Sequence, residues 1–199
     1  MASTPARPGG RTARVRAAVL QAVGDVLADR GLPGIELADI AQRSGVGKTT
    51  VYRRWGSPTA LVADLLIDMA AHSLPRSHTG SLLGDLEANA RLVQRTLDDA
   101  RQGRVFAALI AAAAGDPDTA QALERFYDVR VAEWAPCVDE AVERGELPVG
   151  TDAPAVIRAV SAPLYYHHLT RSGPIGRRRA VTAARAAATA AAAGVFTLT

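Results

Sequence analysis

The sequence contains little of what a strand-rich, disulfide-bonded or membrane-spanning protein requires. Its single cysteine, Cys137, allows no intrachain disulfide and no cysteine-based zinc site. A run of about 18 apolar residues, the length of a membrane span, is absent, so we expect no span. Aromatic residues make up only 5% of the chain, and alternating β-branched runs and hairpin dipeptides are missing. These absences predict an all-α protein, which we expect in the cytoplasm.

The residues that are present favour a folded, helical chain. The 199 residues are 48% apolar and 22% charged, as in ordinary globular proteins of one domain or two small ones. Pro136 should kink or split the helix predicted over residues 116–144, because proline lacks the backbone N–H. Apolar spacing and capping signals predict about nine helices, over residues 12–29, 37–43, 48–55, 58–73, 82–101, 105–114, 116–144, 152–170 and 177–193.

Charge is distributed unevenly along the chain. Residues 1–56 carry nine basic groups against four acids, whereas residues 57–199 carry fourteen against sixteen. A basic segment attached to a slightly acidic body favours a polyanionic partner for the N-terminal part. The same imbalance also arises from an arginine-rich composition alone, so charge by itself leaves the partner open.

The most informative segment joins the second and third predicted helices. Ala41 is small enough to let a crossing helix approach closely, and Gly45 supplies the left-handed residue that ends the second helix. Val46 fills the corner between the two helices, while Val51 and Trp55 lie one turn apart and should face the core. A four-residue turn between short helices at a steep angle predicts a helix-turn-helix.

The opposite side of the third helix is polar and basic. A helix of this kind suits the major groove of DNA, where arginine can donate two hydrogen bonds to guanine and threonine can touch a thymine methyl group. The remaining cationic and hydroxyl groups suit phosphates. A solvated face on a structural helical hairpin is the alternative. The predicted DNA-binding residues are Lys48, Thr49, Thr50, Tyr52, Arg53 and Arg54, with Arg53 and Thr49 assigned to bases.

Residues 12–72 resemble the DNA-binding domain of the TetR family of transcriptional regulators, most closely from Ile40 to Trp55. The resemblance implies that the helix from Lys48 to Arg54 is the recognition helix. It also implies that Tyr52 contacts a phosphate and that the helix from Pro58 braces the motif. The protein is therefore expected to be a sequence-specific DNA-binding regulator and not an enzyme.

Two positions depart from the family pattern. Pro58 occupies a place where the family often has a phosphate-binding lysine, and Glu36 occupies a place where it often has a capping serine or threonine. Both departures put the corresponding contacts with the DNA backbone in doubt. A flexible basic N-terminal arm could supply substitute contacts in the minor groove, or be only a solvated tail. Its basic residues, with those just beyond it, are Arg7, Arg11, Arg14 and Arg16.

The predicted domain organisation follows from these assignments. We expect an arm over residues 1–11, a helix-turn-helix domain over 12–56, a connecting helix over 57–73 and a helical regulatory and dimerisation domain over 81–199. Family resemblance implies a homodimer through residues 152–195, and the alanine-rich last helix would permit close approach. That helix could instead pack on its own subunit.

The C-terminal part is also expected to hold a small apolar or aromatic ligand, as regulators that resemble it commonly do. Aromatic side chains with a few polar tips suit such a pocket, although the same side chains could simply form a core. The candidate lining residues are Phe106, Leu109, Phe126, Tyr127, Trp134, Tyr165, Tyr166, His167 and His168. Ligand binding would then separate the recognition helices and release a palindromic operator. A ligand-independent DNA binder and an activator remain alternatives.

Several other kinds of site find no support in the sequence. The segment 47–49 resembles the end of a phosphate-binding P-loop, but Gln42 stands where that motif needs glycine and a helix precedes it. A nucleotide-binding protein is therefore a remote alternative. No catalytic constellation and no cofactor are predicted. A metal site is not predicted either, because the histidines are poorly spaced for chelation: His72, His78, His167 and His168.

Overall fold

The structure is a computed structural model, and it describes residues 9–198. Within these residues the chain forms ten α-helices and one 3-10 turn, and its β-structure is a single isolated bridge between Thr151 and Thr197. The prediction of an all-α fold is confirmed. The tenth helix arises because the segment predicted as one helix over 116–144 is split, with α8 beginning at Pro136.

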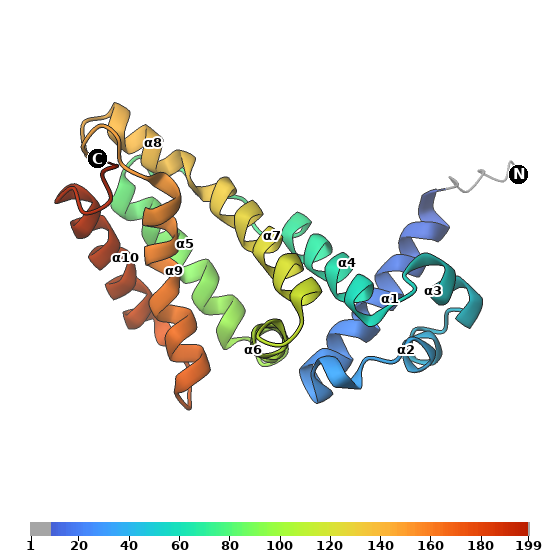
Figure 1. Ribbon diagram of the computed structural model, residues 1–199. Helices are drawn as coiled ribbons and strands as arrows, with labels where there is room; N and C mark the ends of the chain where they lie inside the picture. The colour runs from blue at the N-terminus through green and yellow to red at the C-terminus, as the bar shows by residue number, and fades with distance from the viewer. Residues whose placement is uncertain (1–8, 199) are drawn as a thin grey trace, which may run out of the picture. The chain divides into compact units, whose positions relative to one another are not determined.

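The helix bounds agree closely with those predicted from sequence (Figure 1). The first part of the chain contains α1 (Gly9–Arg30), η1 (Leu32–Gly34), α2 (Leu37–Ser44), α3 (Lys48–Arg54) and α4 (Pro58–Ala71). The second part contains α5 (Leu82–Asp98), α6 (Gln102–Ala113), α7 (Pro117–Trp134), α8 (Pro136–Glu143), α9 (Ala153–Thr170) and α10 (Gly176–Ala192). Among residues 9–198, none of these helices combines the length and the apolar content of a membrane span.

The first helix begins earlier than predicted. The predicted start, Thr12, is a favourable N-cap residue, but α1 already includes Gly9, so Thr12 lies within the first helical turns. Residues 9–11 of the predicted arm are therefore helical, and its residues 1–8 lie outside the described part of the chain. At the other end α1 stops at Arg30, and the next residue, Gly31, adopts a positive φ of 69°.

The described chain divides into two compact units. One contains residues 9–69 and 108–123, and the other contains residues 70–107 and 124–198. The sequence had assigned residues 108–123 to the C-terminal domain, so the compact units and the proposed functional domains follow different boundaries. The functional boundaries stay a prediction.

The core of the first unit forms where α1, α2 and α3 pack together. An apolar stripe along α1 is buried apart from Val15, which is half-buried, and Ile40 of α2 and Val51 of α3 are fully buried with it. Burial of these side chains removes apolar surface from water and supplies most of the stability of such short helices. The fully or almost fully buried members of the stripe are Val19, Val23, Val26 and Leu27.

In the second unit, α5, α9 and α10 pack against one another. Alanines allow α10 to approach its neighbours closely, and the buried ones are Ala180, Ala183, Ala184, Ala187 and Ala191. Asp98 at the end of α5 accepts hydrogen bonds from the backbone amides of Ile175 (2.7 Å) and Gly176 (3.2 Å), where α10 begins. Much of the alanine-rich surface is therefore used for packing within the subunit.

The turn between α2 and α3 depends on the backbone conformation of one glycine. Gly45 has φ 66° and ψ 18°, the left-handed conformation, and directly follows α2. The next amide, that of Val46, donates a hydrogen bond to the carbonyl oxygen of Ala41 (3.1 Å). Residues with a Cβ adopt this conformation only at a cost, so glycine allows the abrupt change of chain direction that presents α3.

We predict that Gly45→Ala lowers the free energy of unfolding by about 1 kcal/mol, because alanine disfavours the left-handed conformation. The measurement is urea denaturation followed by circular dichroism. No heavy atom lies within 4 Å of a Cβ added at Gly45, so a steric clash would not contribute.

Gly47→Ala is the matched control. Gly47 lies in the same turn and a Cβ there also meets open space, but its φ is −55°. Its substitution should change stability by less than about 0.5 kcal/mol, since a poorer N-cap and a less flexible unfolded chain oppose each other. Equal effects of the two substitutions would contradict the role assigned to the left-handed glycine.

Candidate nucleic-acid interface

The third helix exposes one face and buries the other, as its sequence predicts. Val51 is fully buried and Trp55, directly after the helix, is 8% exposed. Thr49 and Arg53 lie opposite Val51, and the other predicted contact residues lie on the flanks of this side. Thr50 is half-buried, and the exposed residues are Lys48, Thr49, Tyr52, Arg53 and Arg54. The structure thus brings all six predicted DNA-binding residues onto one short helix.

The exposed face of α3 is cationic. Lys48 begins the helix, and Arg53 and Arg54 occupy its last turn. Among residues 9–198, no ion pair involves Lys48 or Arg53, so these groups keep their charge available for an external anion. Tyr52, which is 53% exposed, adds a hydroxyl donor on the same helix. This combination fits a surface that binds phosphates and reaches base edges.

Arg54 makes one contact that the sequence did not predict. Its guanidinium carbon lies 4.9 Å from the centroid of the Trp55 ring, which is the geometry of a cation–π interaction. The charged group of Arg54 is therefore held over the aromatic ring while the side chain remains exposed.

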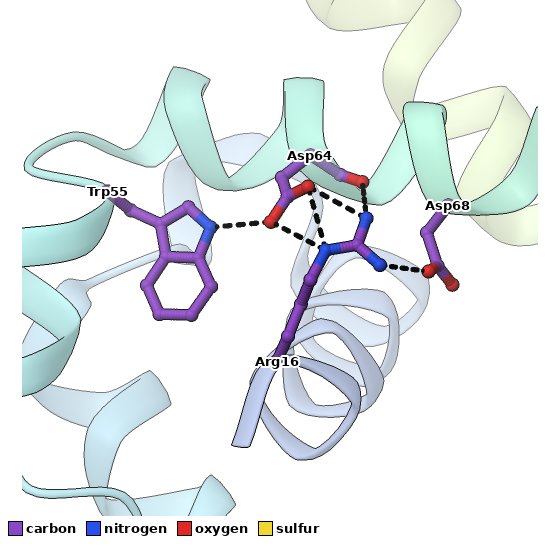
Figure 2. A network of polar contacts seen from close by, with 4 residues as sticks. All are labelled: Arg16, Trp55, Asp64 and Asp68. Atoms are coloured by element: carbon purple, nitrogen blue, oxygen red, sulfur yellow. Dashed lines mark hydrogen bonds and ion pairs between the residues drawn. The ribbon is translucent and has the colours of Figure 1, made fainter. Parts of the chain in front are cut away.

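Trp55 is in turn fixed by a polar network that joins α1 to α4 (Figure 2). The indole Nε1 donates a hydrogen bond to Asp64 Oδ2 (2.9 Å). On its other side, Asp64 accepts hydrogen bonds from Arg16 Nε (3.0 Å) and Nη2 (2.8 Å). The same guanidinium also pairs with Asp68. One carboxylate therefore links α1, the end of α3 and α4.

The pKa of Asp64 is lowered. Partial burial opposes ionisation, but the hydrogen bonds from Arg16 and Trp55 and the positive charges of Arg16 and Arg54 outweigh it. The pKa of Arg16 is raised, mainly by its hydrogen bond to Asp64. The pair is therefore ionised at neutral pH, and these charge-assisted hydrogen bonds are stronger than neutral ones.

This network corrects one expectation. Arg16 was grouped with the basic residues that could reach DNA, but its guanidinium is directed at two carboxylates of α4 and is only partly exposed. Arg11 and Arg14 lie in α1, and Arg7 lies outside the described residues. The sequence analysis missed Asp64 and Asp68. Their spacing of four residues on one helix face, near an arginine-containing helix, was the available signal.

The two residues that depart from the family pattern, Glu36 and Pro58, lie at the starts of helices. Glu36 precedes α2, is exposed, and makes no side-chain hydrogen bond to the helix. Pro58 is the first residue of α4, and the Ser57 hydroxyl accepts a hydrogen bond from the amide of Ala60 (3.1 Å). Proline at the first position of a helix removes no hydrogen bond, so α4 forms without the lysine common in the family.

Four of the predicted ligand-lining residues form a cluster of rings in the second unit. Phe106 and Phe126 lie with ring centroids 5.4 Å apart, and Tyr127 and Tyr165 meet edge to face at 5.5 Å. Phe106 also contacts Tyr165, and Phe126 contacts Tyr127. Burial raises the pKa of Tyr127 to about 12, although its hydrogen bond with Tyr165 opposes this shift. We call these four residues the aromatic cluster.

The remaining predicted lining residues are distributed differently. Tyr166 is 67% exposed on α9, so its assignment to an interior pocket is wrong. Leu109 is buried but falls in the first unit. His168 Nε2 is 2.9 Å from the carbonyl oxygen of Gly103. Trp134 and His167 each have a buried ring nitrogen without a hydrogen-bond partner among the described residues.

Comparison with protein families gives two matches that together cover most of the chain. Residues 19–65 match the model described as "Bacterial regulatory proteins, tetR family". Residues 76–187 match the model described as "Tetracyclin repressor-like, C-terminal domain". The first match contains the helix-turn-helix and α4 up to Asp64 and Leu65, and the second contains the aromatic cluster.

Individual relatives agree with these matches. An uncharacterized HTH-type transcriptional regulator of Bacillus subtilis (strain 168), YdeS, is 29% identical over 153 residues, which cover 76% of this chain and 77% of the relative. The HTH-type transcriptional repressor Rv3405c of Mycobacterium tuberculosis (strain ATCC 25618 / H37Rv) is 39% identical over 103 residues. This match covers 50% of this chain and 48% of the relative.

A solved structure extends the agreement to the fold. The TetR family transcription regulator SCO0332 superposes with a TM-score of 0.69 at 27% identity, over 88% of this chain and 97% of the other. Fold, helix-turn-helix geometry and both family matches therefore lead to one assignment. The chain belongs to the TetR family of bacterial regulatory proteins, which are DNA-binding transcriptional regulators.

Proposed function

We propose that this chain is a ligand-responsive repressor that acts as a homodimer on a palindromic operator. The observation that carries the proposal is the exposed cationic face of α3, presented on a buried helix-turn-helix scaffold. The functional domains proposed from sequence are the helix-turn-helix over residues 12–56, a connecting helix over 57–73 and a regulatory part over 81–199. Repression is supported by the name of the relative Rv3405c, which is a repressor.

In this proposal the residues of α3 divide into two roles. Arg53 donates two hydrogen bonds to a guanine, and Thr49 contacts a thymine methyl group or a base edge. The others bind phosphates and fix the register of the helix in the groove: Lys48, Thr50, Tyr52 and Arg54. Two such helices in a dimer would reach successive major grooves about 34–36 Å apart.

The proposed dimer forms through α9 and α10, within residues 152–195. Tyr166 and Leu169 are large apolar side chains that α9 leaves exposed, and Ala186 is exposed on α10. Burying such residues against a second copy would remove apolar surface from water. Because most alanines of α10 pack within the subunit, the exposed residues of α9 are the stronger support for the dimer.

The proposed ligand is a small apolar or aromatic compound bound near the aromatic cluster. Besides the rings, the second unit contains three buried polar atoms without partners among the described residues, namely Trp134 Nε1, His167 Nε2 and Asn89 Oδ1. Buried polar groups in proteins are nearly always hydrogen-bonded, so unpaired ones support a ligand with polar atoms of its own. The ligand would release the operator by binding the non-DNA-binding state more tightly.

We predict that Arg53→Ala weakens binding to DNA from upstream of the protein's own gene by about 1–3 kcal/mol and relaxes sequence preference at one base pair, because a bidentate guanine contact is lost. Fluorescence anisotropy over a series of salt concentrations measures both effects.

The matched control is Arg125→Ala, which removes the same charge from an exposed position on α7, outside the proposed dimer interface. This variant should bind the operator as the wild type does. If Arg53→Ala and Arg125→Ala lose the same affinity, or if Arg53→Ala keeps full sequence preference, Arg53 does not read a base.

Tyr166→Glu should convert the dimer to a monomer at micromolar concentration. Placing a carboxylate in an apolar interface costs about 2 kcal/mol or more per copy when it finds no partner. Analytical ultracentrifugation gives the oligomeric state. Val149→Glu, at an 86% exposed residue outside α9 and α10, is the control and should leave it unchanged. A dimeric Tyr166→Glu variant would place the interface elsewhere.

The aromatic dye 1-anilinonaphthalene-8-sulfonate is a suitable first probe of ligand binding. We predict that it binds the folded wild type, measured by its fluorescence, and that it lowers operator affinity in the same solution, because binding and release are linked reciprocally. Phe126→Ala, which removes one ring of the cluster, should weaken dye binding by about tenfold if the ring contributes a typical aromatic contact. Dye binding without any change in operator affinity would contradict ligand control.

A further inference from the structure

The strongest unassigned feature of the described residues is the network that ends at Arg54. Asp64 on α4 accepts a hydrogen bond from Trp55, and the Trp55 ring lies beneath the guanidinium of Arg54. Arg16 of α1 pairs with Asp64 from the opposite side, as Figure 2 shows. A continuous set of contacts therefore leads from the α1–α4 junction to a cation on the exposed face of α3.

We propose that Asp64 is a positioning residue for DNA binding, which acts through Trp55 to hold the Arg54 guanidinium ready for a phosphate. This inference rests on the proposed function, in which Arg54 contacts the DNA backbone. Asp64 itself lies on α4 and bonds to Arg16 of α1 and to Trp55, so it would act on DNA only through these neighbours.

The geometry gives each member of the chain a distinct task. Trp55 is 8% exposed, and the apolar part of its ring is packed in the core beside α3. The single N–H donor of the indole bonds to Asp64, and this hydrogen bond fixes the orientation of the ring. With the ring fixed, its face stays under Arg54, and the negative face of the ring attracts the cation.

The ion pair with Arg16 explains why Asp64 can accept the Trp55 hydrogen bond as a charged group while partly buried. Arg16 donates to both carboxylate oxygens and to the backbone carbonyl of Asp64, so the acceptor is itself held in place. The long, flexible side chain of Arg54 would otherwise lose rotamer freedom only on binding DNA. Ordering it beforehand lowers that entropic cost and raises affinity.

Asp68 provides an internal comparison. It lies one turn after Asp64 on α4 and also pairs with Arg16, but the indole of Trp55 donates to Asp64. Asp64→Asn and Asp68→Asn each replace one carboxylate partner of Arg16 by an amide. Only Asp64→Asn alters the acceptor of the Trp55 N–H, so the two variants separate positioning of Arg54 from general support of the α1–α4 junction.

The test is a double-mutant cycle between Asp64→Asn and Arg54→Ala, with operator affinity measured by fluorescence anisotropy. Asp64→Asn should weaken binding about two- to fivefold, the range of an exposed cation–π contact. Arg54→Ala should weaken it at least as much, because the phosphate contact itself is lost. If Asp64 acts through Arg54, Asp64→Asn should have no further effect in the Arg54→Ala background. Trp55→Phe keeps a ring but removes the N–H donor, and its effect should likewise disappear without Arg54.

A second readout is independent of DNA. The chain has only two tryptophans, so a ¹⁵N–¹H spectrum contains two indole signals, and Trp55→Phe assigns them. Asp64→Asn should shift the Trp55 indole proton upfield because its hydrogen bond is weakened, whereas Asp68→Asn should leave that signal in place and reduce affinity less. Circular dichroism confirms that each variant is folded, and Trp55→Phe serves for the cycle if Asp64→Asn is not.

The outcomes distinguish this inference from the proposed function. A wild type that binds no DNA sequence preferentially overturns the proposed function and the inference together. A wild type that binds its operator, with Asp64→Asn and Arg54→Ala additive in the cycle, overturns the inference alone. Equal losses of affinity for Asp64→Asn and Asp68→Asn would overturn it as well, because both would then act only through the α1–α4 junction.

Discussion

The exposed cationic face of α3 depends on the burial of Val51 and Trp55. Helix α3 has only seven residues, far fewer than the roughly 12–15 that an isolated helix needs to be even marginally stable in water. Its shape and orientation must therefore come from its buried side. Because Val51 and Trp55 lie one turn apart, their burial also fixes which residues face outward. The cationic face of α3 is thus a geometric consequence of where its apolar residues are placed.

The fold class and the exposed side of α3 were predictable from the sequence because both follow from periodicity. Helices end or begin at residues with a clear local signal: α1 ends before Gly31, α2 ends before Gly45, and Asp152 caps the start of α9. The start of α1 was not predictable in the same way. Thr12 is a favourable N-cap residue, but the preceding residues continue the helix to Gly9, so a good capping residue lies unused inside it.

Side-chain networks were harder to predict than helices. In the sequence Arg16 resembles the other basic residues near the N-terminus. Only the structure shows that its guanidinium bonds to Asp64, which is 48 residues further along the chain, and so helps to hold the first unit together. The aromatic residues show the same limit. Spacing along α9 does not distinguish Tyr165, which meets Phe106 and Tyr127, from its exposed neighbour Tyr166. Such distinctions depend on which helices pack together, and this is information that periodicity lacks.

The two tryptophans illustrate how the two units differ. Trp55 Nε1 has a carboxylate acceptor, whereas Trp134 Nε1, which is fully buried, has no acceptor among the described residues. An unpaired buried donor of this kind costs about 1–3 kcal/mol. A ligand that supplies an acceptor to Trp134 recovers this cost only in the state it binds, which is the differential affinity that a shift between two states requires. The first unit, with Trp55 already paired, offers no such gain, so the proposed ligand response belongs to the second unit.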